Sequence, residues 1–267
     1  MQKNDKEGKE FKSSPSKSGC GIKGRVVVIT GGARGIGKEI CLEFSARGAL
    51  VVVADIDLNG AAKVAQEIME LGEQAIPFSI DVTKEIHIKK MIDKTIEKYG
   101  RLDILVNNAG INKLSSIEEI TEEEWDTILA VNLKGVFFCS REASKVMRDR
   151  RWGRIINIGS VAGKTGGSTS GIHYCTSKAG VMYLTKNFAY HLAPYGITVN
   201  AIAPGTIETD MTAKWSPEVK AGLIQKTPIG RLGKTSDISA GVVFLASEQA
   251  EYITGEILNI NGGYFMD

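Results

Sequence analysis

Tyr174 and Lys178 stand four positions apart, in the run Tyr174-Cys175-Thr176-Ser177-Lys178, and Ser160 precedes the tyrosine by fourteen positions. On a helix, this spacing puts the tyrosine and the lysine on one face, so the ammonium can favour a tyrosinate. Free tyrosine titrates near about 10, and a nearby positive charge lowers that pKa. A serine hydroxyl within reach could hold a substrate oxygen beside the phenol. The three residues together indicate proton transfer at an alcohol or a carbonyl group.

The elements that must position these side chains alternate along the chain from Arg25 onward, with short β-branched runs between longer segments of helical periodicity. This alternation is typical of a parallel sheet covered on both faces. The expected strands are residues 26–30, 50–54, 75–79, 104–107, 155–159, 198–203 and 257–260, and the expected helices are 36–47, 59–71, 84–99, 121–149, 174–193 and 235–247. Right-handed crossovers then give an α/β fold, a doubly wound Rossmann-type parallel sheet of about seven strands with helices on both faces.

One domain over residues 24–267 is expected, because a chain of 267 residues with 43% hydrophobic content can bury a single large core. Residues 206–233 break the alternation and are expected to form a loop with short helices, either a lid or a surface excursion. Residues 1–23 are rich in Lys, Ser, Gly and Glu, which favours a disordered tail; a regulatory or docking arm is the alternative.

The composition argues against several classes of partner. The 33 basic and 31 acidic residues give a net charge of +2 and are spread along the chain, so a nucleic-acid partner is not expected. The cysteines and histidines form no ligand cluster, which predicts reduced thiols and no bound metal. No apolar run approaches the roughly 18 residues that span a bilayer, and no signal-type stretch opens the chain. We therefore expect a cytoplasmic protein without membrane contact.

A glycine-rich run, Thr30-Gly31-Gly32-Ala33-Arg34-Gly35-Ile36-Gly37, joins the first expected strand to the first expected helix. Glycine permits a tight turn and close backbone approach, and a helix N-terminus offers unpaired amides to a pyrophosphate. The run therefore predicts a dinucleotide site, with Gly31, Arg34, Gly35, Ile36 and Gly37 as contacts. In isolation it is also compatible with a simple strand-to-helix turn.

Asp55 follows the second expected strand, where a carboxylate can accept hydrogen bonds from both ribose hydroxyls of an adenosine. A 2′-phosphate at that place would be repelled, which favours NAD(H). Arg34 could still attract such a phosphate, so NADP(H) is not excluded. Asp55 is alternatively a turn residue before the run Asp57-Leu58-Asn59-Gly60.

Five motifs occur in one order: Thr30 to Gly37, Asn107-Asn108-Ala109-Gly110, Ser160, Tyr174 to Lys178, and Pro204-Gly205. With them, residues 24–267 resemble the short-chain dehydrogenase/reductase family. In this context the catalytic interpretation of Tyr174 and Lys178 outweighs the alternative of a half-buried ring beside a solvated amine. The stretches at residues 202–211 and 252–256 are most similar to the 3-oxoacyl-[acyl-carrier-protein] reductases, and similar stretches occur in sugar, polyol and steroid dehydrogenases.

The resemblance implies a role for each matching residue. Tyr174 would exchange the substrate proton, Ser160 would hold the carbonyl oxygen, and Lys178 would lower the tyrosine pKa and bond the nicotinamide ribose. Asn132 would hold a water that links Lys178 to solvent; its alternative is a mid-helix polar residue. The implied contacts to the cofactor are Asp81 and Val82 at the adenine, Asn108 and Gly110 near the adenosine ribose, Ile207 and Thr209 at the carboxamide, and the Pro204-Gly205 motif.

Two departures from the 3-oxoacyl reductase pattern bear on the substrate. The separation of Ser160 from Tyr174 is one residue longer than usual, which would reshape the substrate pocket. Those reductases also dock their acidic carrier protein with two basic residues. Arg151 matches the first and Tyr195 stands in place of the second, which makes docking of an acyl carrier protein doubtful. They usually prefer NADPH, whereas Asp55 favours NAD(H).

Three functions follow from these observations. The leading hypothesis is a nicotinamide-dependent oxidoreductase that reduces a ketone, with a 3-oxoacyl thioester as the favoured substrate class. The alternative is an NAD-dependent sugar, polyol or hydroxysteroid dehydrogenase. A non-catalytic dinucleotide-sensing or scaffold protein is disfavoured, because no catalytic side chain is missing.

The resemblance also implies a homotetramer or homodimer, with the helices near 121–149 and 174–193 packing across two-fold axes. Apolar positions on these helices either serve that interface or face the sheet: Val136, Phe137, Val181, Leu184 and Phe188.

Overall fold

A seven-stranded parallel sheet with the order β3-β2-β1-β4-β5-β6-β7 forms the centre of the computed structural model, which describes residues 20–166, 170–213 and 215–267. The strands are Val26–Thr30 (β1), Leu50–Asp55 (β2), Ala75–Ser79 (β3), Ile104–Asn107 (β4), Gly153–Ile158 (β5), Ile197–Pro204 (β6) and Ile257–Ile260 (β7). The main helices are Gly35–Ser45 (α1), Leu58–Glu70 (α2), Glu85–Tyr99 (α3), Glu122–Leu129 (α4), Gly135–Arg150 (α5), Ile172–Leu192 (α7) and Thr235–Ala246 (α10). The expected α/β sheet is confirmed.

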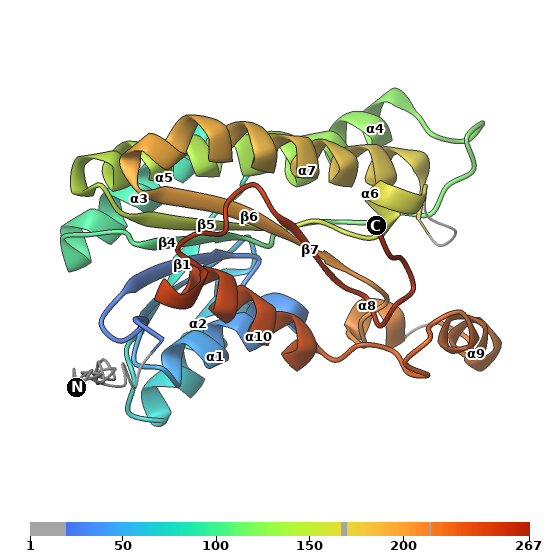
Figure 1. Cartoon of the computed structure of the whole chain (residues 1–267), viewed down its shortest axis with the longest axis horizontal. Helices are drawn as coiled ribbons and strands as arrows, with labels where there is room; N and C mark the ends of the chain where they lie inside the picture. Colours follow the sequence, from blue (N-terminus) through green and yellow to red (C-terminus); the bar gives the residue numbers. More distant parts are fainter. Residues whose placement is uncertain (1–19, 167–169, 214) are drawn as a thin grey trace, which may run out of the picture.

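The helices divide between the two faces of the sheet, as Figure 1 shows: α3, α5 and α7 cover one face, and α1, α2 and α10 cover the other. Successive residues of β1 serve the two layers in turn. Val27 and Ile29 pack with the core beneath α1 and α10, whereas Val28 packs with the core beneath α3, α5 and α7. Because both faces are covered, β1 is buried at every position and reads as a continuous apolar run.

The switch in strand order falls between β1 and β4, which pair in parallel with Thr30 level with Asn107. The chain leaves β1 toward β2 and β3 and then crosses back to β4 on the other side. Ligands of open α/β sheets bind outside the carboxyl ends of the strands at such a switch point. The residues that directly follow β1 and β4 therefore mark the place of the site.

The helix expected over residues 121–149 is interrupted, which corrects the prediction. The π-helical turn η1, Ala130–Lys134, separates α4 from α5. The turn contains Asn132, whose side chain is buried and bonded to the backbone of Ile111. Turns of this kind often mark functional sites. The hydrophobic period does not reveal this one, because a turn of five residues is too short to establish a period of its own.

The N-terminal boundary also differs from the expectation. Ile22 is buried and packs in the core beneath α1 and α10, so residues 20–23 belong to the folded chain rather than to a tail. The rest of the expected disordered tail, residues 1–19, lies outside the described residues.

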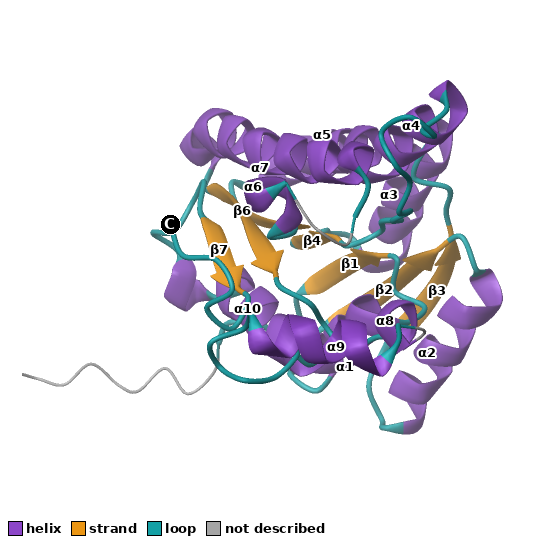
Figure 2. Cartoon of the chain, turned by 90° about the vertical axis from the view of Figure 1, so that its right-hand side faces the viewer, coloured by secondary structure: helices purple, strands orange, loops and turns teal. Residues whose placement is uncertain are grey.

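The segment expected to be a loop with short helices contains α8, Asp210–Ala213, and α9, Pro217–Gln225. Figure 2 shows both helices beside the sheet end at which β6 and β7 finish. The segment is closed at its neck, because Ile207 pairs with Gly233, and the Glu208 amide donates to the Gly233 carbonyl at 2.8 Å. Within the described part of the chain, no helix is both long and apolar enough to span a membrane.

A buried polar chain ties the sheet to the helices above it. The Asn107 amide group donates to the Ser140 hydroxyl at 2.9 Å and to Asn157 Oδ1 at 2.8 Å, and Asn157 Nδ2 donates to Thr185 Oγ1 at 3.0 Å. The chain therefore connects β4, α5, β5 and α7. It fixes the height of α7 above the end of β5, where Ser160 follows.

Substitution of Asn157 by Leu is expected to lower the free energy of unfolding by about 1–3 kcal/mol, because it leaves the Asn107 amide and the Thr185 hydroxyl each short of a partner in the interior. Urea denaturation followed by circular dichroism measures the change. Asn59→Leu is the matched control, since Asn59 is exposed on α2. An equal midpoint for the two variants would show that the polar chain contributes nothing.

Candidate active site

The glycine-rich loop lies at the switch point and is braced from β4. Thr30 Oγ1 accepts hydrogen bonds from the amides of Asn108 and Ala109, and Asn108 Nδ2 donates to the Gly31 carbonyl at 2.9 Å. A Cβ at Gly37 would lie 2.0 Å from the Gly31 carbonyl oxygen, so only glycine lets α1 approach the loop this closely. Asn108 is expected to contact a ribose, but its side-chain amide group donates to the carbonyls of Thr30 and Gly31.

The start of α1 is open to an anion. The N-cap residue Arg34 makes no side-chain capping bond, so no side chain of the helix start satisfies the first amides. Gly35 has a φ of 54°, and a Cβ there would meet only Thr209, at 3.7 Å. The space above Gly35 is therefore open between the glycine loop and the neck of the α8–α9 segment. These features fit a dinucleotide pyrophosphate.

Asp55 ends β2 beside the same loop. Its carboxylate accepts hydrogen bonds from the amide of Ala33 at 3.0 Å and from the amide of Asp57 at 3.0 Å. These bonds hold a half-buried negative charge in a fixed orientation next to the loop. Arg34, the next residue after Ala33, is exposed.

Asp81 and Val82 follow β3, so they lie at the same carboxyl end of the sheet, two strands away from β1. Burial of Asp81 opposes ionisation, but hydrogen bonds from the Thr83 hydroxyl and amide outweigh it and lower the pKa of the carboxyl. Val82 is buried and packs against Gly135 at the start of α5. The pair thus forms a fixed wall, as the adenine contact would require.

Tyr174 and Lys178 occupy successive turns of α7, with the ammonium 5.7 Å from the centre of the phenol ring. Lys178 Nζ donates to the Ile158 carbonyl at 2.8 Å, and burial lowers the pKa of the amine to about 8. Burial raises the pKa of Tyr174, and a hydrogen bond with Ser160 lowers it in part. The structure thus brings Ser160, Tyr174 and Lys178 together.

The expected lowering of the Tyr174 pKa by Lys178 is wrong for the protein alone, since burial of the phenol dominates. The ammonium lies over the ring of Tyr174 and donates a hydrogen bond to the Ile158 carbonyl. It therefore stabilises a phenolate only weakly. The phenol therefore stays protonated at neutral pH and is ready to donate.

Asn132 lies below this pair at the π-turn. Its Oδ1 accepts from the Ile111 amide at 2.9 Å, and its Nδ2 donates to the Ile111 carbonyl at 2.9 Å and to Ser177 Oγ at 3.1 Å. A Cβ at Gly110 would lie 3.3 Å from Asn132 Oδ1 and 3.4 Å from Lys178 Nζ. Gly110 and Asn132 therefore border the lysine, with the side chain of Asn132 engaged by protein groups.

Residues after β6 complete the arrangement. Gly205 follows Pro204 with its amide donating to the Ile260 carbonyl at 3.1 Å, and a Cβ there would meet the backbone of Asn261 at 2.9 Å. Ile207 is buried at the neck, and Thr209 faces Gly35. The predicted site residues thus lie together at one end of the sheet, where the carboxyl ends of β1 to β6 meet.

Sequence reasoning missed several participants. The Ile158 carbonyl, which holds Lys178, belongs to no motif because every residue carries such a group. Ser177 shares the first turns of α7 with Tyr174 and bonds its carbonyl at 2.7 Å, a helical spacing that could have drawn notice. Glu124 and His173 meet at 2.9 Å although 49 positions separate them, and no local signal predicts that contact.

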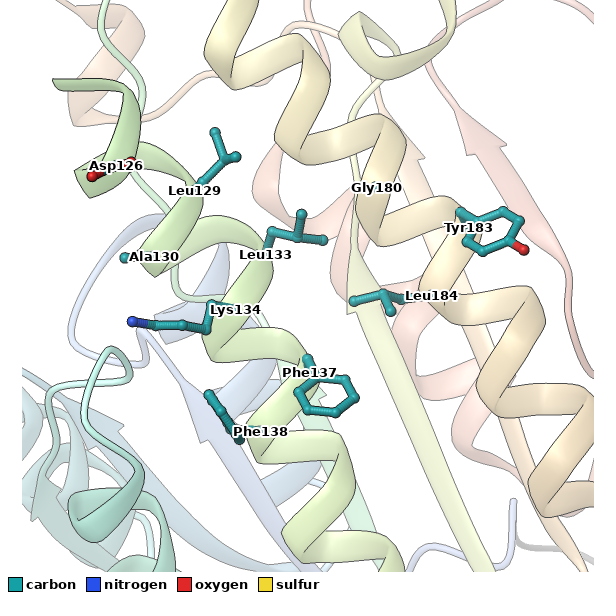
Figure 3. Close-up of a pocket in the computed structure, with 10 residues that line it drawn as sticks. All are labelled: Asp126, Leu129, Ala130, Leu133, Lys134, Phe137, Phe138, Gly180, Tyr183 and Leu184. Atoms are coloured by element: carbon teal, nitrogen blue, oxygen red, sulfur yellow. The ribbon is translucent and has the colours of Figure 1, made fainter. Parts of the chain in front are cut away.

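A groove of about 760 Å³ runs on the outer side of the helices, between α4–η1–α5 and α7 (Figure 3). Phe137 and Leu184 line it, whereas Val136 and Val181 are buried inward and Phe188 packs on the core. Of the five apolar positions that could serve an interface or face the sheet, two thus line the groove and three face the interior. Among the described residues, no group of His, Cys, Asp and Glu could hold a metal ion, and all four cysteines are free.

The sequence matches a protein-family model and several characterised relatives. A family model described as enoyl-(acyl carrier protein) reductase matches residues 31–265. The 3-oxoacyl-[acyl-carrier-protein] reductase FabG of Thermotoga maritima is 40% identical over 242 residues, covering 91% of this chain and 98% of the relative. FabG of Escherichia coli is 41% identical over 245 residues, covering 92% and 99%.

Solved structures agree with these matches. A 3-oxoacyl-[acyl-carrier protein] reductase from Brucella melitensis superposes with a TM-score of 0.88 at 36% identity, over 93% of this chain and 94% of the other. A short-chain type dehydrogenase/reductase from Mycobacterium marinum superposes with a TM-score of 0.89 at 35% identity, over 93% and 98%. The chain belongs to the short-chain dehydrogenase/reductase family and is an oxidoreductase that acts on alcohol or carbonyl groups with a nicotinamide cofactor.

Proposed function

We propose that the protein catalyses the NAD(H)-dependent reduction of a 3-oxoacyl thioester, with Tyr174 as the proton donor. The observation that carries the proposal is the set of Ser160, Tyr174 and the buried Lys178 beside an open helix N-terminus and a fixed Asp55 carboxylate. The relatives named as 3-oxoacyl-[acyl-carrier-protein] reductases support the substrate class.

The cofactor would lie from Asp55 and the Asp81–Val82 wall, across Gly31 to Gly37, to Lys178, with Ile207 and Thr209 at its nicotinamide end. Arg34, Asn108, Gly110, Pro204 and Gly205 border the same path. A bound nicotinamide supplies the hydride. The observed open space above Gly35 fits such a ligand.

The protein's own side chains handle the oxygen of the substrate. The Ser160 hydroxyl holds the carbonyl oxygen beside the phenol, and Tyr174 donates its proton to that oxygen as the alcohol forms. Lys178 lies 5.7 Å from the ring centre and has a pKa of about 8, so its main contribution is as a nearby proton source that can reprotonate the phenolate left behind. A water near Asn132 that connects Lys178 to solvent stays a prediction.

The surface around Arg151 and Tyr195 does not favour docking of a carrier protein. The Arg151 guanidinium donates to the Pro194 carbonyl at 2.8 Å, and Arg148 stacks over Tyr195 at 4.7 Å. The guanidinium that matches the family's first docking residue is thus partly engaged by the chain itself. A substrate on a small thioester such as coenzyme A fits this surface better than one that needs the carrier protein.

The groove beside α4, η1, α5 and α7 supports a homodimer or homotetramer in which these helices meet those of a second copy. Its lining is mostly apolar, with Leu129, Leu133, Phe137 and Leu184 on facing helices (Figure 3). Solvent exposure of such a surface is unfavourable in an isolated monomer. We further propose a cytoplasmic enzyme with no nucleic-acid or membrane partner.

The first test measures oxidation of NADH and of NADPH with acetoacetyl-CoA, and reverse turnover with sugars, polyols and hydroxysteroids. Reduction of acetoacetyl-CoA with NADH preferred is the expected result. Turnover confined to a member of the alcohol panel would reject the thioester proposal and favour the NAD-dependent sugar, polyol or hydroxysteroid dehydrogenase. No turnover of any substrate would favour the dinucleotide-sensing alternative.

Tyr174→Phe is expected to lower kcat about 10²- to 10⁴-fold with NADH affinity unchanged, because it removes only the transferred proton. Stopped assays give kcat, and fluorescence titration gives the Kd for NADH. Tyr190→Phe is the matched control, since Tyr190 is exposed on the same helix and does not line the groove. Retention of wild-type kcat by Tyr174→Phe would remove the tyrosine from the mechanism.

Asp55→Asn is expected to raise the ratio of kcat/KM for NADPH over NADH about tenfold or more. The amide keeps an acceptor for the Ala33 amide but removes the charge that repels a 2′-phosphate, and Arg34 then attracts it. Asp57→Asn, an exposed neighbour, serves as the control. A ratio that moves equally in both variants would exclude Asp55 as the selector.

A further inference from the structure

The carboxylate of Glu124, in the first turn of α4, joins three segments that are distant in the sequence. Oε1 meets the Ser115 hydroxyl at 2.6 Å and His173 Nε2 at 2.9 Å, and Oε2 pairs with the Lys113 ammonium. The Glu124 side chain is 9% exposed, and His173 is fully buried. One carboxylate thus connects α4, the loop after β4 and the start of α7.

The chemistry of the pair is determined by its surroundings. Hydrogen bonds from Lys113 and Ser115 lower the pKa of Glu124 to about 2. Partial burial opposes this shift, and the hydrogen bond from His173 adds to it. The carboxylate is therefore ionised at every working pH and can only accept hydrogen bonds. It follows that His173 donates from Nε2 to Glu124.

Contacts with other segments hold the start of α7, which has no local side-chain cap. The N-cap residue is Gly171, and its own amide donates to the Lys113 carbonyl at 3.2 Å, which ties the entry of the helix to the loop after β4. The imidazole of His173 packs so closely that a Cβ at Gly171 would lie 2.4 Å from Cε1. The first turn of α7 is thus held by groups from α4 and the loop after β4.

This first turn carries Tyr174, directly after His173. Lys178 has a separate attachment, through the Ile158 carbonyl, and the glycine-rich loop has its own through Asn108. The contact between Glu124 and His173 is therefore adjacent to the tyrosine, whereas the lysine and the glycine-rich loop have attachments of their own.

We propose that Glu124, acting through His173, is a positioning residue that holds the Tyr174 phenol in register with Ser160. The same carboxylate fixes residues 113–115, which follow the Ile111 backbone bonded to Asn132. The proposal rests on the function proposed above, since it assigns Tyr174 the proton transfer. It predicts a defect in the chemical step and not in cofactor binding.

The test compares Glu124→Ala, Glu124→Gln and the control Glu123→Ala in the full chain, with acetoacetyl-CoA and NADH. Glu123 is exposed in the same helical turn. Glu124→Ala is expected to lower kcat about 10- to 100-fold, the scale of a small misplacement of a reacting group, with the Kd for NADH within about twofold. Glu124→Gln keeps an oxygen for Ser115 and His173 and is expected to recover most of the rate.

A kcat for Glu124→Ala equal to that of Glu123→Ala would overturn the proposal, and so would equal losses of kcat and NADH affinity. If Glu124→Ala does not fold, His173→Phe keeps a buried ring without the donor, and wild-type kcat in that variant would overturn it instead. Wild-type turnover in the same assay tests the function separately. If the wild type acts only on another substrate, the variants are compared with that substrate.

Discussion

The parallel pairing of β1 with β4 is the constraint on which the rest of the structure depends. It sets Thr30 level with Asn107, so the two chains that leave the sheet there emerge side by side. Asn108 can then bond the carbonyls of the glycine-rich loop, and the loop delivers the start of α1 to the same edge. Without this register the glycines would form an ordinary turn with nothing to hold it open.

Burial decides the protonation states around the proposed proton donor. The same loss of solvent raises the pKa of the Tyr174 phenol and lowers the pKa of the Lys178 amine, so both effects favour uncharged groups. The phenol is thereby kept as an acid in the protein alone. The bond from Lys178 to the Ile158 carbonyl offsets part of the cost of placing an ammonium there.

Polar side chains in the interior carry the geometry from the sheet to the reacting groups. The chain from Asn107 through Asn157 to Thr185 sets the height of α7, and Asn132 at the π-turn ties the loop after β4 to Ser177. Each bond satisfies a group that would otherwise be costly to bury. The same bonds restrict sliding of α7 along the sheet. A purely apolar layer would resist such sliding less, because apolar contacts are not directional.

The sequence by itself determined the α/β architecture, the seven strands and the residues that gather at the site, because hydrophobic period and short motifs are local properties of the chain. It also predicted the loop with short helices over residues 206–233. It did not reveal the π-turn at Asn132, the folded residues around Ile22 or the contact between Glu124 and His173. Those features, and the raised pKa of Tyr174, were decided only by the tertiary structure, because burial and contacts between distant segments exist only after the chain has packed.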